Sequence, residues 1–166
     1  MIKIIDNFFE DKSLLNIQDH ITTKLIFTPE YFENAKERNK ESHYGDRFDL
    51  ENDINLLNTF VKQTEKKFKI KINKVRNAGV DIRNLDSFKP HTDIAKINVF
   101  IMLKGPTAVT NGTVFYTQGE LDIHVGFREN RAILFPSNWV HSPHRSEVPN
   151  LKRYTASLFI QDYEEE

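Results

Sequence analysis

The stretch Arg131-Ala132-Ile133-Leu134-Phe135-Pro136-Ser137-Asn138-Trp139-Val140-His141 joins an apolar run to a turn and then to a histidine. The run is typical of a buried strand, and the Pro-Ser-Asn segment is a turn signal. Similar short β-branched or aromatic runs, mostly separated by turn residues, occupy 69–76, 79–83, 95–103, 112–117, 121–125, Val140 and 153–160. No helical pattern lies between them, so residues 69–160 are predicted to form an antiparallel sandwich or barrel.

The first third of the chain has a different pattern. Residues 3–9 are predicted to form a strand, followed by a helix that Ser13 caps and a second helix over 50–68 that Asn52 or Asp53 caps. Twelve of the 24 residues from 30 to 53 are charged, without a clean period. We interpret 30–53 as an exposed loop, with the alternative that its aromatic residues make it a flap over a site.

Composition limits the class of protein. The chain has 166 residues, 39% hydrophobic and 28% charged, which suits one folded domain over 1–166. There is no cysteine, so any metal must be bound by His and carboxylates. An acid at residue 6 interrupts the apolar start and the longest later apolar run is 99–103, so we expect a soluble cytoplasmic protein without a signal or membrane segment.

One triplet, His91-Thr92-Asp93, carries two metal-ligand types on the same side of an extended segment. By itself this spacing is weak support, but His141 completes a set of two His and one Asp. Such a set binds one face of octahedral Fe(II) and leaves three positions open, as catalysis requires. His144 is the alternative distal ligand, although Pro143 is expected to turn the chain away from the site before it.

A candidate co-substrate-binding residue, Arg153, follows twelve positions after His141. Arg153 opens a β-prone run, and a buried arginine beside a metal would pair with a second carboxylate of a co-substrate. Thr155 lies on the same face of the strand and could add a hydroxyl donor.

With these residues in place, the chain resembles the Fe(II)- and 2-oxoglutarate-dependent dioxygenases, in particular their prolyl-hydroxylase-like branch and its short phage-type members. Four segments carry the resemblance in the family's order: 91–93, 112–116 (Gly-Thr-Val-Phe-Tyr), 132–137 leading into His141, and 153–155. The chain departs from the family at 111–113, where two glycines and an acid are common, and at Thr155, where many relatives have serine. The resemblance implies an α+β, mainly β fold: a double-stranded β-helix, or jelly roll, over 69–166, supported by N-terminal helices packed on one sheet and a flap within 1–68.

The resemblance also implies an activity. His91, Asp93 and His141 would bind Fe(II), and Arg153 and Thr155 would bind 2-oxoglutarate. With dioxygen the enzyme would hydroxylate a C–H bond and release succinate and CO2. The carboxylate of Asp93 favours hydroxylation over halogenation.

Two further polar residues are ambiguous. Asn98, in an apolar strand, is either a buried structural amide or a contact to 2-oxoglutarate. Tyr116 is either a second contact or a core tyrosine.

Two other classes of protein remain open from the sequence. One is a cupin-type metal-binding jelly roll without 2-oxoglutarate chemistry, which would leave Arg153 unexplained. The other is a non-catalytic binding module. We expect a small-molecule or peptide substrate and no membrane partner, and the net charge of −1 argues against nucleic acid without excluding it.

Overall fold

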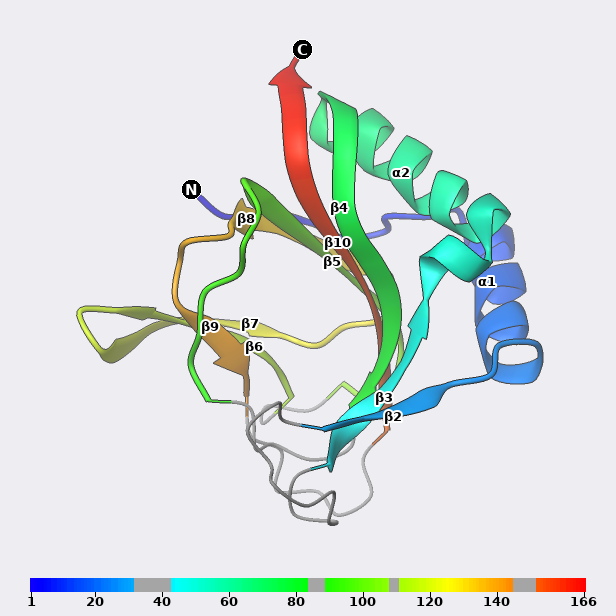
Figure 1. The fold of residues 1–166 in the computed structure, drawn as a ribbon, viewed down its shortest axis with the longest axis horizontal. Helices are drawn as coiled ribbons and strands as arrows, with labels where there is room; N and C mark the ends of the chain where they lie inside the picture. The colour runs from blue at the N-terminus through cyan, green and yellow to red at the C-terminus, as the bar shows by residue number, and fades with distance from the viewer. Residues whose placement is uncertain (32–42, 84–88, 108–110, 145–151) are drawn as a thin grey trace.

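The computed structural model describes residues 1–31, 43–83, 89–107, 111–144 and 152–166 as two antiparallel sheets with two helices (Figure 1). The larger sheet has seven strands. In spatial order these are β1 (Lys3–Ile5), β8 (Arg131–Pro136), β5 (Ile97–Lys104), β10 (Arg153–Glu165), β4 (Ile70–Arg83), β3 (His43–Asp49) and β2 (Thr28–Tyr31). All its pairings are antiparallel, and β10 is the central strand, between β5 and β4.

The smaller sheet faces the larger one and has the order β7 (Glu120–Gly126), β6 (Gly112–Thr117) and β9 (His141–Pro143). On its other side, β9 forms an isolated antiparallel bridge through His141 to His91. Two facing antiparallel sheets whose consecutive strands cross between them make a jelly roll, as predicted.

The protein has two cores, one on each face of the larger sheet. The helices α1 (Asp11–Thr23) and α2 (Ile54–Phe68) cover the outer face, where Ile21 and Phe60 pack against Val99 and Leu158 (Figure 1). The inner face packs on the smaller sheet through an aromatic cluster that includes Phe115 and Phe135. Within the described chain, neither helix is long and apolar enough to cross a membrane.

The predicted elements differ from the structure at three places near the helices and β4. Helix α1 begins at Asp11 after Glu10, so Ser13 lies inside the helix and does not cap it. The short helix η1 (Leu50–Asn52) precedes α2, and the Asp53 side chain caps α2 by accepting a hydrogen bond from Leu56 N at 3.1 Å. The two strands predicted over 69–76 and 79–83 are the single strand β4, because residues 77–79 keep their pairing with β10.

The segment 30–53 is not simply a loop. Its described parts include the end of β2 and all of β3, which pairs with β4 from Asp46 to Asp49. The sequence did not predict this strand because its charged residues are typical of an exposed loop. In the structure Arg47 is buried and pairs with Asp81 of β4. The flap expectation falls on residues 32–42, which lie outside the described residues.

Candidate functional site

The three metal ligands predicted from the sequence lie together at the edge of the smaller sheet. They are His91, Asp93 and His141. One potential ligand atom from each lies within 4.8 Å of the others. The backbone brings them together, since His91 N donates to His141 O at 3.0 Å and His141 N donates to His91 O at 2.9 Å. Asp93 N in turn donates to Ser137 O at 2.9 Å. The triplet and the distal histidine are therefore neighbours by strand pairing.

Both imidazole rings are oriented by their Nδ1 atoms. Nδ1 of His91 lies 2.9 Å from Lys89 O, and Nδ1 of His141 lies 2.9 Å from Trp139 O. An Nδ1–H that donates to a carbonyl makes Nε2 the lone-pair nitrogen, which is the form that binds a metal. The Nε2 atoms of both rings point toward Asp93, at 3.7 Å from Oδ1 for His91 and 3.1 Å from Oδ2 for His141.

The Nε2 atom of His141 is the strongest indication that this group binds something. It is buried and makes no hydrogen bond of acceptable geometry with any described residue, although Asp93 Oδ2 is 3.1 Å away. A buried polar atom without a directed partner is costly, and a bound cation would satisfy it. Two neutral imidazoles and one carboxylate fit Fe(II) or a similar divalent ion.

The protonation states favoured in this site are those that metal ligands need. Burial lowers the pKa of His91, which favours the neutral ring. Burial alone would raise the pKa of Asp93, but the close contact with His141 Nε2, the charge that either histidine carries when protonated and the hydrogen bond from Asn98 hold that pKa below its ordinary value. A neutral His91 and an ionised Asp93 bind a divalent cation without first losing protons.

Asn98 lies behind Asp93 rather than along the cavity. Its side-chain NH2 donates to Asp93 Oδ2 at 2.6 Å, and its carbonyl oxygen accepts a hydrogen bond from Ser137 Oγ at 2.7 Å. Asn98 and Ser137 are fully buried. This chain of hydrogen bonds fixes the carboxylate of Asp93.

A cavity of about 260 Å³ extends from these three residues between the sheets. Its floor is the inner face of the larger sheet, where alternate residues of β10, β5 and β4 point inward. The β10 residues in its lining are Arg153, Thr155, Ser157 and Phe159. Arg153 is 7% exposed, and its Nη1 donates to Asn111 Oδ1 at 2.6 Å and to Gly112 O at 2.8 Å. The cavity therefore contains a metal-ligand group and a buried, held guanidinium.

The glycine at 112 is required by its surroundings. A Cβ there would lie 2.2 Å from Val125 O, and the residue has a φ of +142°. Only glycine fits without a shift of the β6–β7 pairing. This position belongs to the glycine-threonine-aromatic segment singled out in the sequence.

Two other candidate residues lie elsewhere. The Tyr116 hydroxyl is 3.1 Å from Ser142 Oγ, and Tyr116 is not in the cavity lining. The ring of His144 lies 4.5 Å from that of His124, tilted by 39°, and the structure puts His141 and not His144 beside Asp93.

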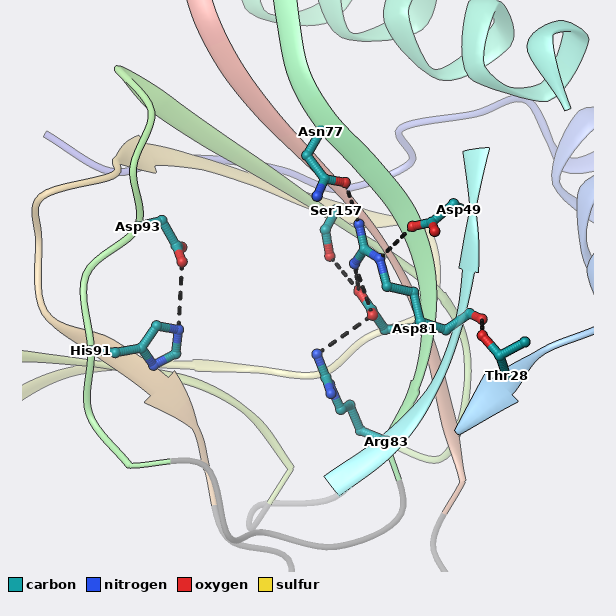
Figure 2. A network of polar contacts seen from close by, with 9 residues as sticks. Thr28, Asp49, Asn77, Asp81, Arg83, His91, Asp93 and Ser157 are labelled. Atoms are coloured by element: carbon teal, nitrogen blue, oxygen red, sulfur yellow. Dashed lines mark hydrogen bonds and ion pairs between the residues drawn. The ribbon is translucent and has the colours of Figure 1, made fainter. Parts of the chain in front are cut away.

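The wall opposite the histidines contains charged residues that sequence reasoning missed. Arg47 of β3 donates to both carboxylate oxygens of Asp81 on β4, at 3.0 and 3.2 Å, and Ser157 Oγ donates to the same carboxylate at 2.7 Å. Arg83 Nη2 lies 3.5 Å from it. Figure 2 shows this network facing His91 and Asp93 across the interior, and the cavity lining includes residues from both sides.

One signal in the sequence points to this wall. Asn77, Gly79, Asp81 and Arg83 alternate with apolar residues, which marks one polar face of a strand.

Comparison with known proteins gives structural neighbours only. No family model matches the sequence, and no curated protein matches it. Solved structures with a similar fold include an oxidoreductase of the 2OG-Fe(II) oxygenase family from Burkholderia pseudomallei, with 15% identity and a TM-score of 0.63 over 98% of this chain and 84% of that chain.

Two further neighbours carry bound ligands. A prolyl hydroxylase from Trichoplax adhaerens, in complex with a peptide fragment of hypoxia inducible factor, has 12% identity and a TM-score of 0.68 over 97% of this chain and 83% of that chain. The epimerase SnoN, in complex with Fe3+, alpha ketoglutarate and nogalamycin RO, has 9% identity and a TM-score of 0.64 over 99% of this chain and 78% of that chain. With its two facing sheets and outer helices, the chain has the jelly-roll fold of the 2-oxoglutarate- and Fe(II)-dependent oxygenases.

Proposed function

We propose that this protein is an Fe(II)- and 2-oxoglutarate-dependent oxygenase that hydroxylates a C–H bond of its substrate. The observation that carries the proposal is the presence, in one cavity, of the His91, Asp93 and His141 group and the buried Arg153. A metal site alone suits many proteins. An additional held guanidinium in the same cavity suits a metal-bound co-substrate with a second carboxylate.

In this proposal His91, Asp93 and His141 hold Fe(II) through one imidazole nitrogen each and one carboxylate oxygen. Bound Fe(II) supplies dioxygen activation, in which substrate, O2 and 2-oxoglutarate yield hydroxylated substrate, succinate and CO2. Asn98 keeps Asp93 oriented, because it occupies one carboxylate oxygen through a 2.6 Å hydrogen bond. The carboxylate of Asp93 is also the feature that favours hydroxylation over halogenation.

Arg153 and Thr155 would bind the far carboxylate of 2-oxoglutarate. Asn111 and the Gly112 carbonyl hold the Arg153 guanidinium in place by accepting hydrogen bonds from one of its nitrogens. The Thr155 hydroxyl lies in the cavity lining two residues along the same strand. Phe100, Met102 and Phe127 add apolar walls that keep water away from the reacting groups.

The test combines a binding readout with turnover. Anaerobic protein with Fe(II) is expected to develop a visible absorption band when 2-oxoglutarate is added, and to form succinate once O2 is admitted. His91→Ala should lose Fe(II) binding, and Arg153→Ala should weaken 2-oxoglutarate binding while Fe(II) still binds.

Arg76→Ala is the matched control, because Arg76 is exposed and lies outside the cavity lining. Fe(II) binding without any 2-oxoglutarate-dependent band would favour the cupin-type alternative. Unchanged metal affinity in His91→Ala would favour a non-catalytic module.

A further inference from the structure

The guanidinium of Arg47 is held by its edge on the wall opposite the metal-ligand group. Nε donates to Asp49 Oδ1 at 3.0 Å, Nη1 to Asp81 Oδ1 at 3.0 Å, and Nη2 to Asn77 Oδ1 at 2.7 Å. Figure 2 shows the three acceptors of these hydrogen bonds, Asp49, Asn77 and Asp81, close together on this wall. Each of its three nitrogens therefore already donates to the protein, although the side chain lines the cavity.

Gly79 explains where the flat face of this guanidinium lies. A Cβ at Gly79 would be 2.3 Å from Cζ of Arg47, 2.5 Å from Nη2 and 2.6 Å from Nε. In these distances Cζ is the nearest of the three atoms, so the Cβ position lies above the guanidinium plane, over Cζ. A Cβ in that plane, on the side of Nε and Nη2, would lie closer to these two nitrogens than to Cζ. The guanidinium therefore lies flat on β4 at Gly79, and no larger residue fits beneath it.

One flat face of Arg47 is covered by Gly79, which leaves the opposite face as the one that can line the cavity. Asn77, Gly79 and Asp81 belong to the inward face of β4, so a group lying on Gly79 has the cavity above it. The Arg47 side chain keeps 10% of its surface exposed. Because all three nitrogens already donate to protein acceptors, the main surface that Arg47 offers a ligand is its charged plane.

A charged plane binds a ligand by stacking. A guanidinium attracts the face of an aromatic or conjugated ring, and the attraction grows when water is excluded. A saturated ring such as pyrrolidine has no π face to present. Phe159, beside Asn77 in the strand pairing, and Phe100 add apolar contacts in the same cavity.

We propose that the substrate of this oxygenase carries a planar conjugated ring that stacks on the guanidinium of Arg47. The inference rests on the proposed function for the assignment of this ligand as the substrate. It selects, among the substrates that suit this chemistry, an aromatic or heteroaromatic ring over a prolyl side chain. Asp81 fixes the plane by pairing with Arg47 and Arg83, and Gly79 leaves the space for it.

The test compares matched planar and saturated rings on the wild-type protein at saturating 2-oxoglutarate, so that carboxylate probes do not compete at Arg153. The pairs are benzoate with cyclohexanecarboxylate, and thymidine with 5,6-dihydrothymidine. NMR titration should give about tenfold tighter binding of the planar member in at least one pair. The Arg47 Nε–H signal, identified by its loss in Arg47→Lys, should shift upfield through the ring current.

Preference within the first pair alone assigns a carbocyclic ring, and preference within the second pair alone assigns a nucleobase-like ring. Equal affinities within both pairs, or no shift of the Arg47 signal, would overturn the proposal. The affinity comparison within each pair uses the wild-type protein alone, so that outcome does not depend on how well Arg47→Lys folds.

Variants then locate the interaction. Arg47→Lys keeps the charge but removes the plane, so it should abolish the preference for planar rings. Arg76→Lys makes the same exchange on the neighbouring strand β4, outside the cavity lining, and should retain the preference. Loss of the preference in both variants, or in neither, contradicts the assignment to Arg47.

The two proposals fail separately. Succinate formation from 2-oxoglutarate without ring binding overturns only the stacking inference. Ring binding without any 2-oxoglutarate-dependent band or succinate overturns only the proposed function.

Discussion

The two sides of the cavity use similar charged residues in opposite ways. On one side, the ligand atoms of His91, Asp93 and His141 converge, and the buried Nε2 of His141 has no directed hydrogen bond among the described residues. On the other, Asp81 accepts from Arg47 and Ser157 and is almost fully buried. Polar groups that satisfy one another stabilise the fold, whereas groups that converge unsatisfied are completed by a ligand. The difference separates the part of the cavity that should bind the metal from the part that should shape it.

Removing Asp93 should give the largest effect on ligand binding. Asp93→Ala is expected to lower divalent-metal affinity by at least about 100-fold and to abolish succinate formation, because it deletes one of three ligands. The metal-free protein should lose less stability than when Asp81 is removed, since Asp93 pairs with no buried guanidinium and its loss only deprives the buried Asn98 amide of one acceptor. Calorimetric titration with Fe(II) and thermal unfolding without metal measure the two quantities. A strongly destabilised variant that still binds metal would reverse the comparison.

Removing Asp81 should give the opposite pattern. Asp81→Ala leaves the guanidinium groups of Arg47 and Arg83 without this buried carboxylate, and breaking such a pair costs about 3–5 kcal/mol of unfolding free energy. The metal affinity of the folded protein should stay close to that of wild type. Urea unfolding and metal titration of the same sample test both expectations. Asp81→Asn keeps the shape and one acceptor but not the charge, so an equal loss in the two variants would show that charge sets the stability, and a much smaller loss in Asp81→Asn would show that shape does.

Asn98 tests the comparison further. Its own side-chain groups are hydrogen-bonded to Asp93 and Ser137, yet it lies on the metal-ligand side of the cavity. Asn98→Ala removes the 2.6 Å hydrogen bond to Asp93 Oδ2, and loss of such a supporting contact typically weakens metal binding about 10- to 100-fold. Asn16→Ala, at an exposed position of α1, is the matched control. If Asn98→Ala binds metal like wild type, the orientation of Asp93 does not depend on this amide.

The smallest effect is expected at an exposed ion pair, which gives the baseline for both sides. The hydrogen bond from Arg131 lowers the pKa of Asp6; burial opposes it, and the charges of Arg131 and Arg128 lower the pKa further. Asp6→Asn should cost less than about 1 kcal/mol at neutral pH. Because the folded-state pKa lies below the ordinary 3.8, this contribution is complete above 3.8 and disappears as pH falls through the folded-state value. Unfolding curves of variant and wild type should therefore converge in strong acid, and a gap that persists there would contradict the ion-pair origin.

The parts of this molecule that sequence could predict are those set by short-range patterns. Alternating apolar runs gave the strands around the cavity, and the spacing of His91 and Asp93 marked two of the metal-ligand types. The charged strand β3 was missed because its charges are satisfied by a strand far along the chain, with Arg47 pairing to Asp81. The position of Asn98 behind Asp93 likewise depends on the turn that brings Ser137 beside both. Such contacts follow from strand register, which local sequence does not specify.

The backbone bridge between His91 and His141 makes the amides of these two residues reporters of local opening at the proposed metal site. Each of these two residues donates its amide proton to the carbonyl of the other, so both protons are protected only while the two segments are joined. Any fluctuation that frees them also separates the two imidazoles. The hydrogen-exchange rates of these amides in the metal-free protein therefore measure how often the site comes apart, and bound metal would slow both together.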